Sequence, residues 1–391
     1  MLVPSYYEFF CPVKILSGHQ ALKNLPYEMD QLGAKRALIV TDPGVVAAGL
    51  IQQVQAAFEG SDREIGAIFD QTPPDSSDKV ARQVAELFKS KGCDCLVAVG
   101  GGSSIDTAKG ANLMLTEGTD DLLKFQGAER TKKTMKPFIV VPTTAGTGSE
   151  VTMAAVITNT EKNIKMSITS YKILPNVAIL DPKMTLTMPP KITAATGMDA
   201  LTHAVEAYYC LQKNPVSDSL SITAIKLVLE NLVKAVQNGQ DENLRLAMAN
   251  AALLAGISFS NSLVGVVHSL AHATGGVCHV PHGVANAIFL PWGVEYNIPK
   301  RAGMIAELAP LFGAASSGNA QKDAQAVVSA IRDLNAKLKS LCGLPTTLRE
   351  TGVTEDKLEA IAKTAVNDGT VAMNPEDVTV PDALGLLKKA F

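Results

Sequence analysis

The first half of the chain alternates short apolar runs with stretches of helical periodicity. Near-continuous apolar runs predict strands at Arg36–Asp42, Glu64–Phe69, Cys95–Val99, Pro137–Val141 and Val177–Asp181. Helical patterns between them cover Val45–Phe58, Asp78–Lys91 and a segment that ends at Leu115. Strands buried on both faces and separated by helices are typical of a parallel α/β sheet. A hairpin is predicted later in this half, where Ala155–Thr158 and Lys165–Ile168 flank the turn-like Asn159–Asn163.

The second half has a different pattern, which begins after Pro189 and Pro190. Helical periodicity covers residues 192–210, 216–237, 242–270, 303–312 and 321–340, and no strand alternation is long enough to build a sheet. We therefore expect two domains. An α/β domain with a Rossmann-like parallel sheet spans residues 1–190, and an all-α domain spans residues 191–391.

Composition excludes several classes of protein. The 391 residues are 47% hydrophobic, which excludes global disorder, and a net charge of −3 offers no basic surface for nucleic acid or an anionic membrane. The longest apolar stretch, Ala251–Val267, is interrupted by Asn261 and serines, so we expect it inside the protein and not in lipid. The N-terminal MLVPSYYEFF lacks the features of a signal peptide, and the six cysteines show no disulfide spacing. These features predict a cytoplasmic protein with reduced thiols.

A glycine-rich turn lies between the third predicted strand and its helix, in the sequence Gly100-Gly101-Gly102-Ser103-Ser104. Glycine lets a ligand approach the backbone, and a helix N-terminus presents unpaired N–H groups, so this turn is a candidate phosphate site. Its spacing is not GxGxxG. Ser103 and Asp106 also match a capping box, which would close the helix without any ligand. Both interpretations stay open at this point.

Two other strand ends carry candidate nucleotide contacts. Asp42 closes the first strand, where a carboxylate can accept hydrogen bonds from ribose hydroxyls and repel a 2′-phosphate, favouring NAD over NADP. The alternative is a turn residue in Thr-Asp-Pro-Gly. The loop after the fourth strand supplies hydroxyl and backbone donors without charge, through Thr143, Thr144, Thr147 and neighbouring glycines. Three such loops at three strand ends together favour a bound nucleotide.

Histidines gather in the second half, where five of the six lie between residues 203 and 282. Asp199 and His203 are four residues apart on one predicted helix, and His268 and His272 repeat that spacing in the most apolar helix. His282 stands in a Pro-His-Gly turn before another apolar helix. One carboxylate and several imidazoles on apolar helices predict a divalent transition metal, and the residue types suit Fe(II), Zn(II), Co(II) or Ni(II).

Four longer motifs show a resemblance to a known family. They are GGGSSIDTAKG (100–110), PTTAGTGSEVT (142–152), TAATGMDALTHAVEAY (193–208) and HSLAHATGGVCHVPHGVANAIFLP (268–291). With them the chain resembles the iron-containing (group III) alcohol dehydrogenases from about Tyr6 to its C-terminus. The resemblance implies the dehydroquinate synthase-like fold of that family, with NAD and Fe(2+) as cofactors.

The same resemblance implies roles for individual residues. The metal would be held by Asp199, His203, His268 and His282. His272 would lie beside the nicotinamide, and Ala154, Phe259 and Val264 would line the substrate pocket. The cofactor contacts would be Asp42, Gly101, Gly102, Ser103, Thr143, Thr144, Thr147, Thr152 and Lys165, of which Gly101 and Thr147 come from the loop patterns above. The chain departs from many relatives at Asp75, where they carry Asn, and at Ala154 and Ala155, where they carry larger side chains.

These features predict an NAD(H)-linked enzyme that interconverts primary alcohols and aldehydes, with the metal as a Lewis acid on the substrate oxygen. His272 would relay the proton or orient the cofactor, and both roles stay open. The alternatives are a sugar-phosphate cyclase or a glycerol-type polyol dehydrogenase of the same superfamily, and a non-enzymatic binding module. The metal motifs contain no basic side chain other than histidine, which favours a small uncharged substrate. We expect no nucleic acid or membrane partner, and a homo-oligomer, by resemblance a dimer.

Overall fold

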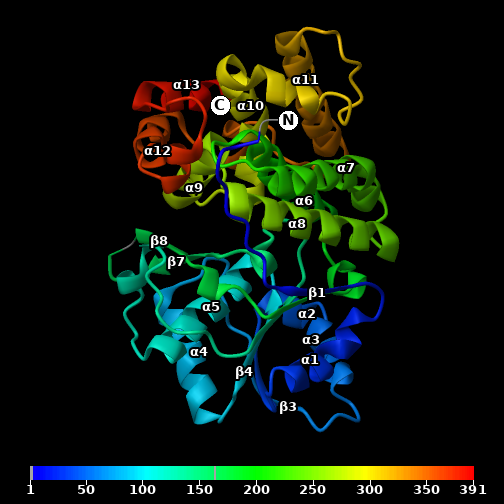
Figure 1. Ribbon diagram of the computed structural model, residues 1–391, viewed down its shortest axis with the longest axis vertical. Coiled ribbons are helices and arrows are strands. Elements are labelled where there is room, and N and C mark those ends of the chain that lie inside the picture. Colours follow the sequence, from blue (N-terminus) through cyan, green and yellow to red (C-terminus); the bar gives the residue numbers. More distant parts are fainter. Residues whose placement is uncertain (1–2, 163) are drawn as a thin grey trace. The chain divides into compact units, whose positions relative to one another are not determined.

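The computed structural model describes residues 3–162 and 164–391, and the chain divides into two compact units (Figure 1). The α/β unit comprises Phe10–Met188, and the helical unit comprises Pro189–Phe391 together with the segment before Phe10. The predicted domain boundaries, 1–190 and 191–391, place that N-terminal segment in the α/β domain instead. Its described residues form neither strand nor helix, so no periodicity indicates the unit to which they belong.

The α/β unit is built on a six-stranded sheet in the order β1-β9-β6-β4-β2-β3, and every pairing in it is parallel. The strands are β1 (Lys14–Ser17), β2 (Arg36–Val40), β3 (Glu64–Phe69), β4 (Cys95–Gly100), β6 (Phe138–Pro142) and β9 (Val177–Leu180). The helices of this unit are α1 (Leu25–Gln31), α2 (Pro43–Ala47), α3 (Leu50–Ala57), α4 (Asp78–Ser90) and α5 (Gly102–Glu117). The predicted Rossmann-like parallel sheet is confirmed.

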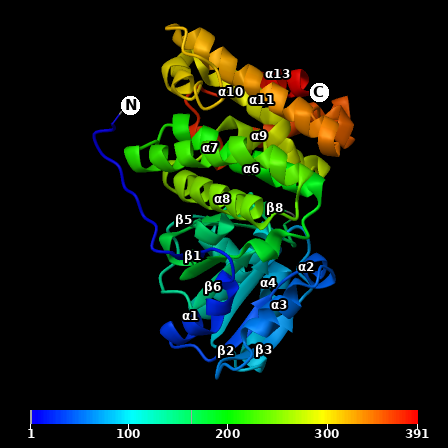
Figure 2. The same cartoon turned by 90° about the vertical axis from the view of Figure 1, so that its right-hand side faces the viewer.

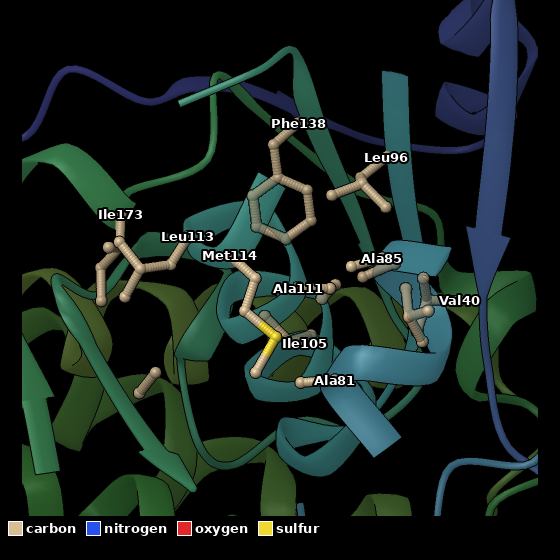
Figure 3. Close-up of a cluster of buried hydrophobic side chains, with 14 of the residues drawn as sticks. Val40, Ala81, Ala85, Leu96, Ile105, Ala111, Leu113, Met114, Phe138 and Ile173 are labelled. Atoms are coloured by element: carbon tan, nitrogen blue, oxygen red, sulfur yellow. The ribbon is translucent and has the colours of Figure 1, made fainter. Parts of the chain in front are cut away.

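Helices cover both faces of this sheet, as the alternation along β4 shows. Leu96 and Ala98 join a buried cluster with side chains of α4 and α5, among them Ile105 (Figure 3). Val97 and Val99 point the other way and join a second cluster with side chains of α1 and α3. Successive side chains of a strand point to opposite faces, so a strand with apolar residues at every position requires such cover on both sides.

A smaller sheet of three strands has the order β5-β8-β7 and comprises β5 (Gly127–Ala128), β7 (Ala154–Asn159) and β8 (Ile164–Thr169). The antiparallel pairing of β7 with β8 confirms the predicted hairpin, although Asn163 of its turn lies outside the described residues. The sequence analysis missed β1 and β5. β1 is an edge strand with mostly exposed side chains, and β5 has two residues, so neither has an apolar pattern.

The helical unit contains α6 to α13, and its described residues include no strand. Its helices are α6 (Pro190–Tyr209), α7 (Pro215–Gln237), α8 (Glu242–Ser262), α9 (Val266–Cys278), α10 (His282–Glu307), α11 (Ala320–Cys342), α12 (Leu358–Ala365) and α13 (Val380–Ala390). Helices α6, α7 and α8 pack against one another (Figure 2). The predicted all-α composition is confirmed.

Two helices predicted as continuous are broken by residues with positive φ. Gly49, with φ 74° and in the left-handed helical conformation, separates α2 from α3, and Leu263, with φ 63°, ends α8 before α9 begins. A positive φ ends a right-handed helix, and hydrophobic periodicity does not reveal it. The helix predicted at 303–312 is instead the end of α10 and the turns that follow it. No single helix of the described chain is long and apolar enough to cross a membrane; α8 and α9 pass that test only as a pair bent by 104°.

Candidate functional site

Four predicted ligands come together in the helical unit. Asp199 and His203 lie one turn apart on α6, His268 lies in the first turn of α9, and His282 is the first residue of α10. Each offers one ligand atom, and these atoms all lie within 4.8 Å of one another. His282, predicted to lie in a turn before a helix, begins that helix. His272 lies outside this group of four.

The donor set fits a divalent transition metal. The amide nitrogen of Asn286, on α10, lies 2.6 Å from Asp199 Oδ1, 3.0 Å from His282 Nε2 and 3.3 Å from His268 Nε2. An amide group has two hydrogens, so it cannot satisfy three acceptors at once. His282 Nε2 and Asp199 Oδ1 are 3.5 Å apart, which adds to the local excess of lone pairs. Carboxylate oxygen and imidazole nitrogen together suit Fe(II), Zn(II), Co(II) or Ni(II).

Local sequence explains how α10 reaches α6 beside these ligands. Pro281 is followed at once by the first turn of α10, which contains His282 and Gly283. A Cβ atom at Gly283 would lie 2.5 Å from the carbonyl oxygen of Ala195 and 3.5 Å from Asp199 Cβ. Only glycine permits this approach of the two backbones. The Pro-His-Gly sequence therefore brings His282 close to Asp199.

Burial keeps His268 in the form that binds metals. Its side chain is buried, and the pKa of its imidazole is lowered well below the usual value, first by burial and then by His203, His282 and His272. A neutral imidazole retains one ring nitrogen with a free lone pair, which is the form that ligates a cation. His268 also stacks against His203, with ring centroids 4.4 Å apart.

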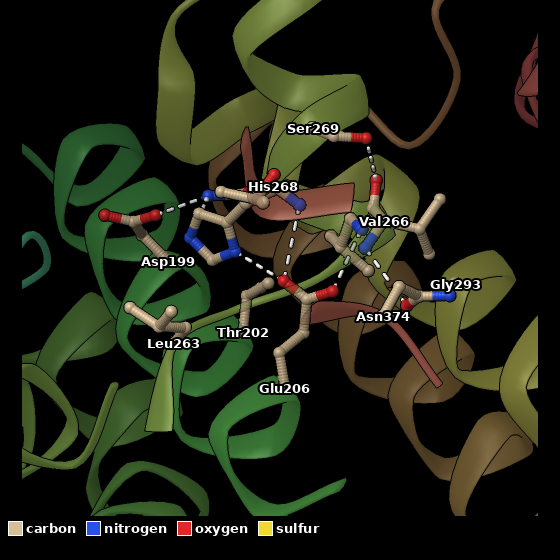
Figure 4. A network of polar contacts seen from close by, with 12 residues as sticks. Asp199, Thr202, Glu206, Leu263, Val266, His268, Ser269, Gly293 and Asn374 are labelled. Atoms are coloured by element: carbon tan, nitrogen blue, oxygen red, sulfur yellow. Dashed lines mark hydrogen bonds and ion pairs between the residues drawn. The ribbon is translucent and has the colours of Figure 1, made fainter. Parts of the chain in front are cut away.

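The sequence analysis missed Glu206, which lies behind His268. Figure 4 shows its carboxylate directed at the His268 ring and at the start of α9. Oε2 is 2.5 Å from His268 Nδ1, and Oε1 accepts a hydrogen bond of 2.9 Å from the backbone N–H of Val267. Burial raises the pKa of Glu206 to about 7. The available signal was its position on α6, three residues after His203, as a second carboxylate on the helix that carries Asp199.

His272 has a carboxylate partner that the sequence analysis also missed. Its Nδ1 lies 2.9 Å from Asp368 Oδ2, at the start of a short 3-10 helix (Gly369–Met373). The His272 ring stacks against that of His282, with centroids 5.2 Å apart. Burial by itself would raise the pKa of Asp368. The hydrogen bond and the charge interaction with His272 act in the opposite direction, and the pKa of Asp368 is lowered. No apolar or helical pattern connects residues 272 and 368, which are 96 positions apart.

Two of the three predicted pocket residues lie in the helical unit. Phe259, on α8, stacks on the His203 ring with centroids 4.2 Å apart. Val264 is buried in the three-residue connection between α8 and α9. Ala154 belongs to the α/β unit, where its carbonyl oxygen accepts a hydrogen bond from Lys109.

In the α/β unit, the predicted cofactor residues follow three neighbouring strands of the sheet. Asp42 follows β2, Gly101 and Gly102 follow β4, and Thr143 begins the loop after β6. Carboxyl ends of neighbouring parallel strands share one edge of a sheet, so these segments are brought together there. The loops touch. A Cβ atom at Gly102 would lie 3.1 Å from a side-chain atom of Thr147, and one at Gly101 would lie 3.2 Å from Thr144.

The capping box, which was the alternative to a phosphate site at the start of α5, is not formed. Gly101 is the N-cap residue of α5, and no side chain caps that helix. The hydroxyl of Ser103 donates instead to the carbonyl oxygen of Pro74. Asp106 accepts hydrogen bonds from the Ser149 hydroxyl (2.7 Å) and the Val156 backbone (2.9 Å). Long-range partners therefore replace the local one that the spacing predicted. Asp42, in contrast, caps α2 by accepting from the Val45 N–H.

Lys109 holds the loop after β6 and was also missed by the sequence analysis. Its ammonium group is buried and donates to Ser149 Oγ (3.2 Å), Thr152 O (2.9 Å) and Ala154 O (2.7 Å). Burial lowers the pKa of Lys109 to about 8 and raises that of the nearby Glu150 to about 7. The chain thus fixes this loop with a cation of its own.

Two predicted cofactor contacts take part in other interactions. Thr152 accepts from Lys109 through its hydroxyl as well as its carbonyl oxygen. Lys165, on β8, forms an exposed ion pair of 2.9 Å with Asp75, the residue that departs from the family pattern.

Comparisons with known proteins agree with this arrangement. Residues 12–182 match the family model "Iron-containing alcohol dehydrogenase", and residues 193–391 match "Fe-containing alcohol dehydrogenase family, C-terminal". The chain is 39% identical to the NAD-dependent methanol dehydrogenase of Bacillus methanolicus, over 98% of this chain and 99% of that protein. It is 38% identical to the 1,3-propanediol dehydrogenase of Klebsiella pneumoniae over the same shares.

Solved structures agree as well. A crystal structure of 1,3-propanediol oxidoreductase has a TM-score of 0.95 at 37% identity, over 99% of this chain and 100% of that one. Sulfoacetaldehyde reductase from Bifidobacterium kashiwanohense, in complex with NAD+, has a TM-score of 0.87 at 29% identity over 99% of both chains. Two family models that together cover almost the whole chain, and relatives matched over their full length, lead to one conclusion: this protein belongs to the iron-containing alcohol dehydrogenase family.

Proposed function

We propose that this alcohol dehydrogenase interconverts small uncharged primary alcohols and aldehydes with NAD(H), at a divalent metal held by Asp199, His203, His268 and His282. The observation that carries this proposal is the convergence of the four ligand atoms within 4.8 Å. The absence of lysine and arginine from residues 199–209 and 268–290 supports an uncharged substrate. Fe(2+) is the expected metal because of the family.

A divalent cation bound there would act as a Lewis acid that lowers the pKa of the alcohol and polarises the aldehyde. The four ligating side chains would hold it at one point of the helical unit. Phe259 and Val264 present apolar surface beside His203 and the start of α9, and we assign them to the substrate pocket. Apolar walls exclude water, which strengthens every charge interaction inside the pocket.

We assign the proton transfer to His272. Asp368 accepts from Nδ1 of this ring, so the other nitrogen, Nε2, is free to take up and release a proton. The carboxylate stabilises the imidazolium that forms when alcohol is oxidised. If His272 only orients the nicotinamide, its replacement will alter NADH affinity more than the pH dependence of turnover.

The cofactor is proposed to bind at the carboxyl ends of β2, β4 and β6. A diphosphate would face the N-terminus of α5, a helix of 16 residues that no side chain caps, with Gly101, Gly102, Ser103, Thr143, Thr144 and Thr147 around it. Asp42 would accept from the ribose, which favours NAD over NADP. Thr152 and Lys165 complete the proposed set. The methanol dehydrogenase relative is NAD-dependent and the sulfoacetaldehyde reductase was solved with NAD+, and both support this assignment.

The test is metal analysis of protein purified without oxygen, followed by NADH oxidation with a panel of short aldehydes that includes a polyol-derived one. We expect about one divalent metal per chain and turnover that chelation abolishes. A metal-free protein with full activity would contradict the Lewis-acid role. Phosphate elimination without net change in NADH would instead indicate a sugar-phosphate cyclase.

We also propose that the enzyme works in the cytoplasm as a homo-oligomer, with a dimer as the simplest form. All six cysteines are free thiols, which supports a reducing compartment. Val3, Tyr6 and Tyr7 are exposed apolar side chains close together in sequence, which supports an interface. Light scattering of the purified protein measures the mass directly.

A further inference from the structure

We propose that Glu206 positions His268 for the metal and supplies the second negative charge of this site. This inference rests on the metal-dependent function proposed above and assigns a role to a residue outside the four ligands. It is a positioning role, because Glu206 reaches the metal site only through the His268 ring.

Three hydrogen bonds join the Glu206 carboxylate to the start of α9, and the Tyr209 hydroxyl donates a longer one of 3.5 Å to Oε1. Oε2 lies 2.5 Å from His268 Nδ1 and 3.3 Å from the backbone nitrogen of the same residue, and Oε1 accepts from Val267 N at 2.9 Å. The Glu206 side chain is fully buried. Both oxygens therefore bind the first turn of α9, and Oε2 also binds the His268 ring (Figure 4). The carboxylate thus fixes the orientation of the ring relative to the helix.

These contacts determine which ring nitrogen carries the proton. A cation at the site would favour the ionised form of Glu206, and an ionised carboxylate only accepts hydrogen bonds, so His268 would then place its hydrogen on Nδ1. Nε2 then keeps its lone pair, and it is Nε2 that lies 3.3 Å from the Asn286 amide and on the Asp199 side of the ring. Metal-ligating histidines in proteins commonly donate their other N–H to a carboxylate, which also makes the ligating nitrogen more basic.

The two buried carboxylates also balance a double positive charge. With a cation bound, three neutral imidazoles would contribute no charge, whereas Asp199 and Glu206 would contribute one negative charge each, because a nearby positive charge favours the ionised form of a carboxylate. Both of these side chains are nearly or completely inaccessible to solvent, where an unbalanced charge is costly. The described site is therefore matched to a divalent cation in particular.

A neighbouring residue provides a matched control. Asn374 also binds the start of α9, accepting from the Val266 N–H at 3.2 Å, but the structure gives it no contact with the His268 ring. A Cβ atom at Gly265 would lie 2.6 Å from Asn374 Oδ1 and 3.2 Å from Glu206 Oε1, so both side chains pack closely around the same turn. Asn374→Ala removes an anchor of the helix and leaves the ring contact in place.

The experiment compares Co(II) affinity of metal-free wild type, Glu206→Gln and Asn374→Ala by competition titration, followed through the visible absorption of cobalt. Glu206→Gln keeps the size of the side chain but loses its charge and one acceptor. We expect it to bind Co(II) about 10–100-fold more weakly than wild type, with an altered cobalt spectrum. Asn374→Ala should lower the thermal unfolding midpoint and keep wild-type cobalt affinity and spectrum. NADH binding should be unchanged in both variants.

Wild-type affinity and spectrum in Glu206→Gln would overturn the proposal, as would an equal loss of affinity in Asn374→Ala. A wild-type protein that binds no Co(II) would instead contradict the proposed function. If Glu206→Gln does not fold, the proposal is tested by NMR of ¹⁵N-histidine-labelled, Zn(II)-loaded wild type, which shows which ring nitrogen of His268 carries the proton. We expect the His268 proton on Nδ1, assigned by its absence from His268→Asn protein, and a proton on Nε2 would refute the positioning role.

Discussion

Each unit of this protein contains a buried cluster of polar side chains. The two clusters differ in the source of the positive charge that their buried oxygens and nitrogens require. In the α/β unit, the ammonium group of Lys109 binds oxygens of Ser149, Thr152 and Ala154, so the cation is part of the chain. In the helical unit, Asp199 and the histidines present ligand atoms within 4.8 Å of one another, and the metal motifs contain no lysine or arginine.

This difference indicates a separate role for each cluster. A built-in lysine cannot be exchanged and offers no vacant coordination position, so it suits a loop that must keep one shape, such as the loop proposed to contact NAD. A converging set of neutral imidazoles and a carboxylate suits a metal, which can bind a substrate oxygen in addition to its protein ligands.

The largest effect is expected from His268→Ala. Loss of a buried ligand should remove the metal and lower turnover by about 10⁴-fold, equivalent to about 5.5 kcal/mol, because a Lewis acid contributes several kcal/mol to such a reaction. Metal content and initial rates measure this together. His279→Asn, which changes an exposed histidine outside the cluster, is the control and should keep both. Full metal content in His268→Ala would refute the assigned ligand set.

A large loss of stability is expected from Lys109→Met. Removal of the ammonium group leaves the Thr152 and Ala154 carbonyl oxygens and the Ser149–Asp106 pair without their cation. Breaking such a buried arrangement costs about 4 kcal/mol. Urea unfolding measures the free energy, and titration with NADH should show weaker binding because the loop is no longer fixed. Lys89→Met, an exposed lysine on α4, should change neither quantity. Unaltered NADH affinity in Lys109→Met would separate this cluster from the cofactor.

Metal addition should stabilise the protein through the histidine cluster. At a free concentration of 100 times the dissociation constant, Zn(II) should raise the free energy of unfolding by about 3 kcal/mol. Thermal unfolding of metal-free protein with and without Zn(II) measures the shift. We expect the shift to persist in Lys109→Met and to vanish in His268→Ala. Its persistence in both would mean that the ion binds elsewhere.

The smallest effect concerns pH. The pKa of Glu150 is raised to about 7 in the folded protein by burial, so the folded state holds this proton more tightly than the unfolded state. Stability should therefore fall as pH rises from 5 to 7.5, by about 2 kcal/mol from this residue. Lys109, whose pKa is about 8, contributes to pH dependence above this window. Glu206, whose pKa is also raised to about 7, adds a fall of similar size in metal-free protein, so Glu150→Gln should remove about half of the total slope between these pH values. Equal slopes in both proteins would contradict the assignment.

Much of the fold was predictable because it follows from local patterns. The strand β4 has apolar residues at every position, which already requires cover on both faces, and α6 shows its Asp199–His203 spacing directly. Errors came where one residue with positive φ interrupted a predicted helix, as at Gly49 and Leu263. They also came at β1, whose exposed edge position leaves no apolar alternation.

The sequence by itself determined the residue types of the metal site, the glycine-rich turn before α5 and the family. Only the tertiary structure decided the partners of those residues. Ser103 and Asp106 match a local cap, yet they bind Pro74, Ser149 and Val156, and Glu206 meets His268 across 62 positions of the chain. The physical reason is that a buried polar group must find a partner wherever packing brings one, and spacing along a helix describes only the neighbours on that helix.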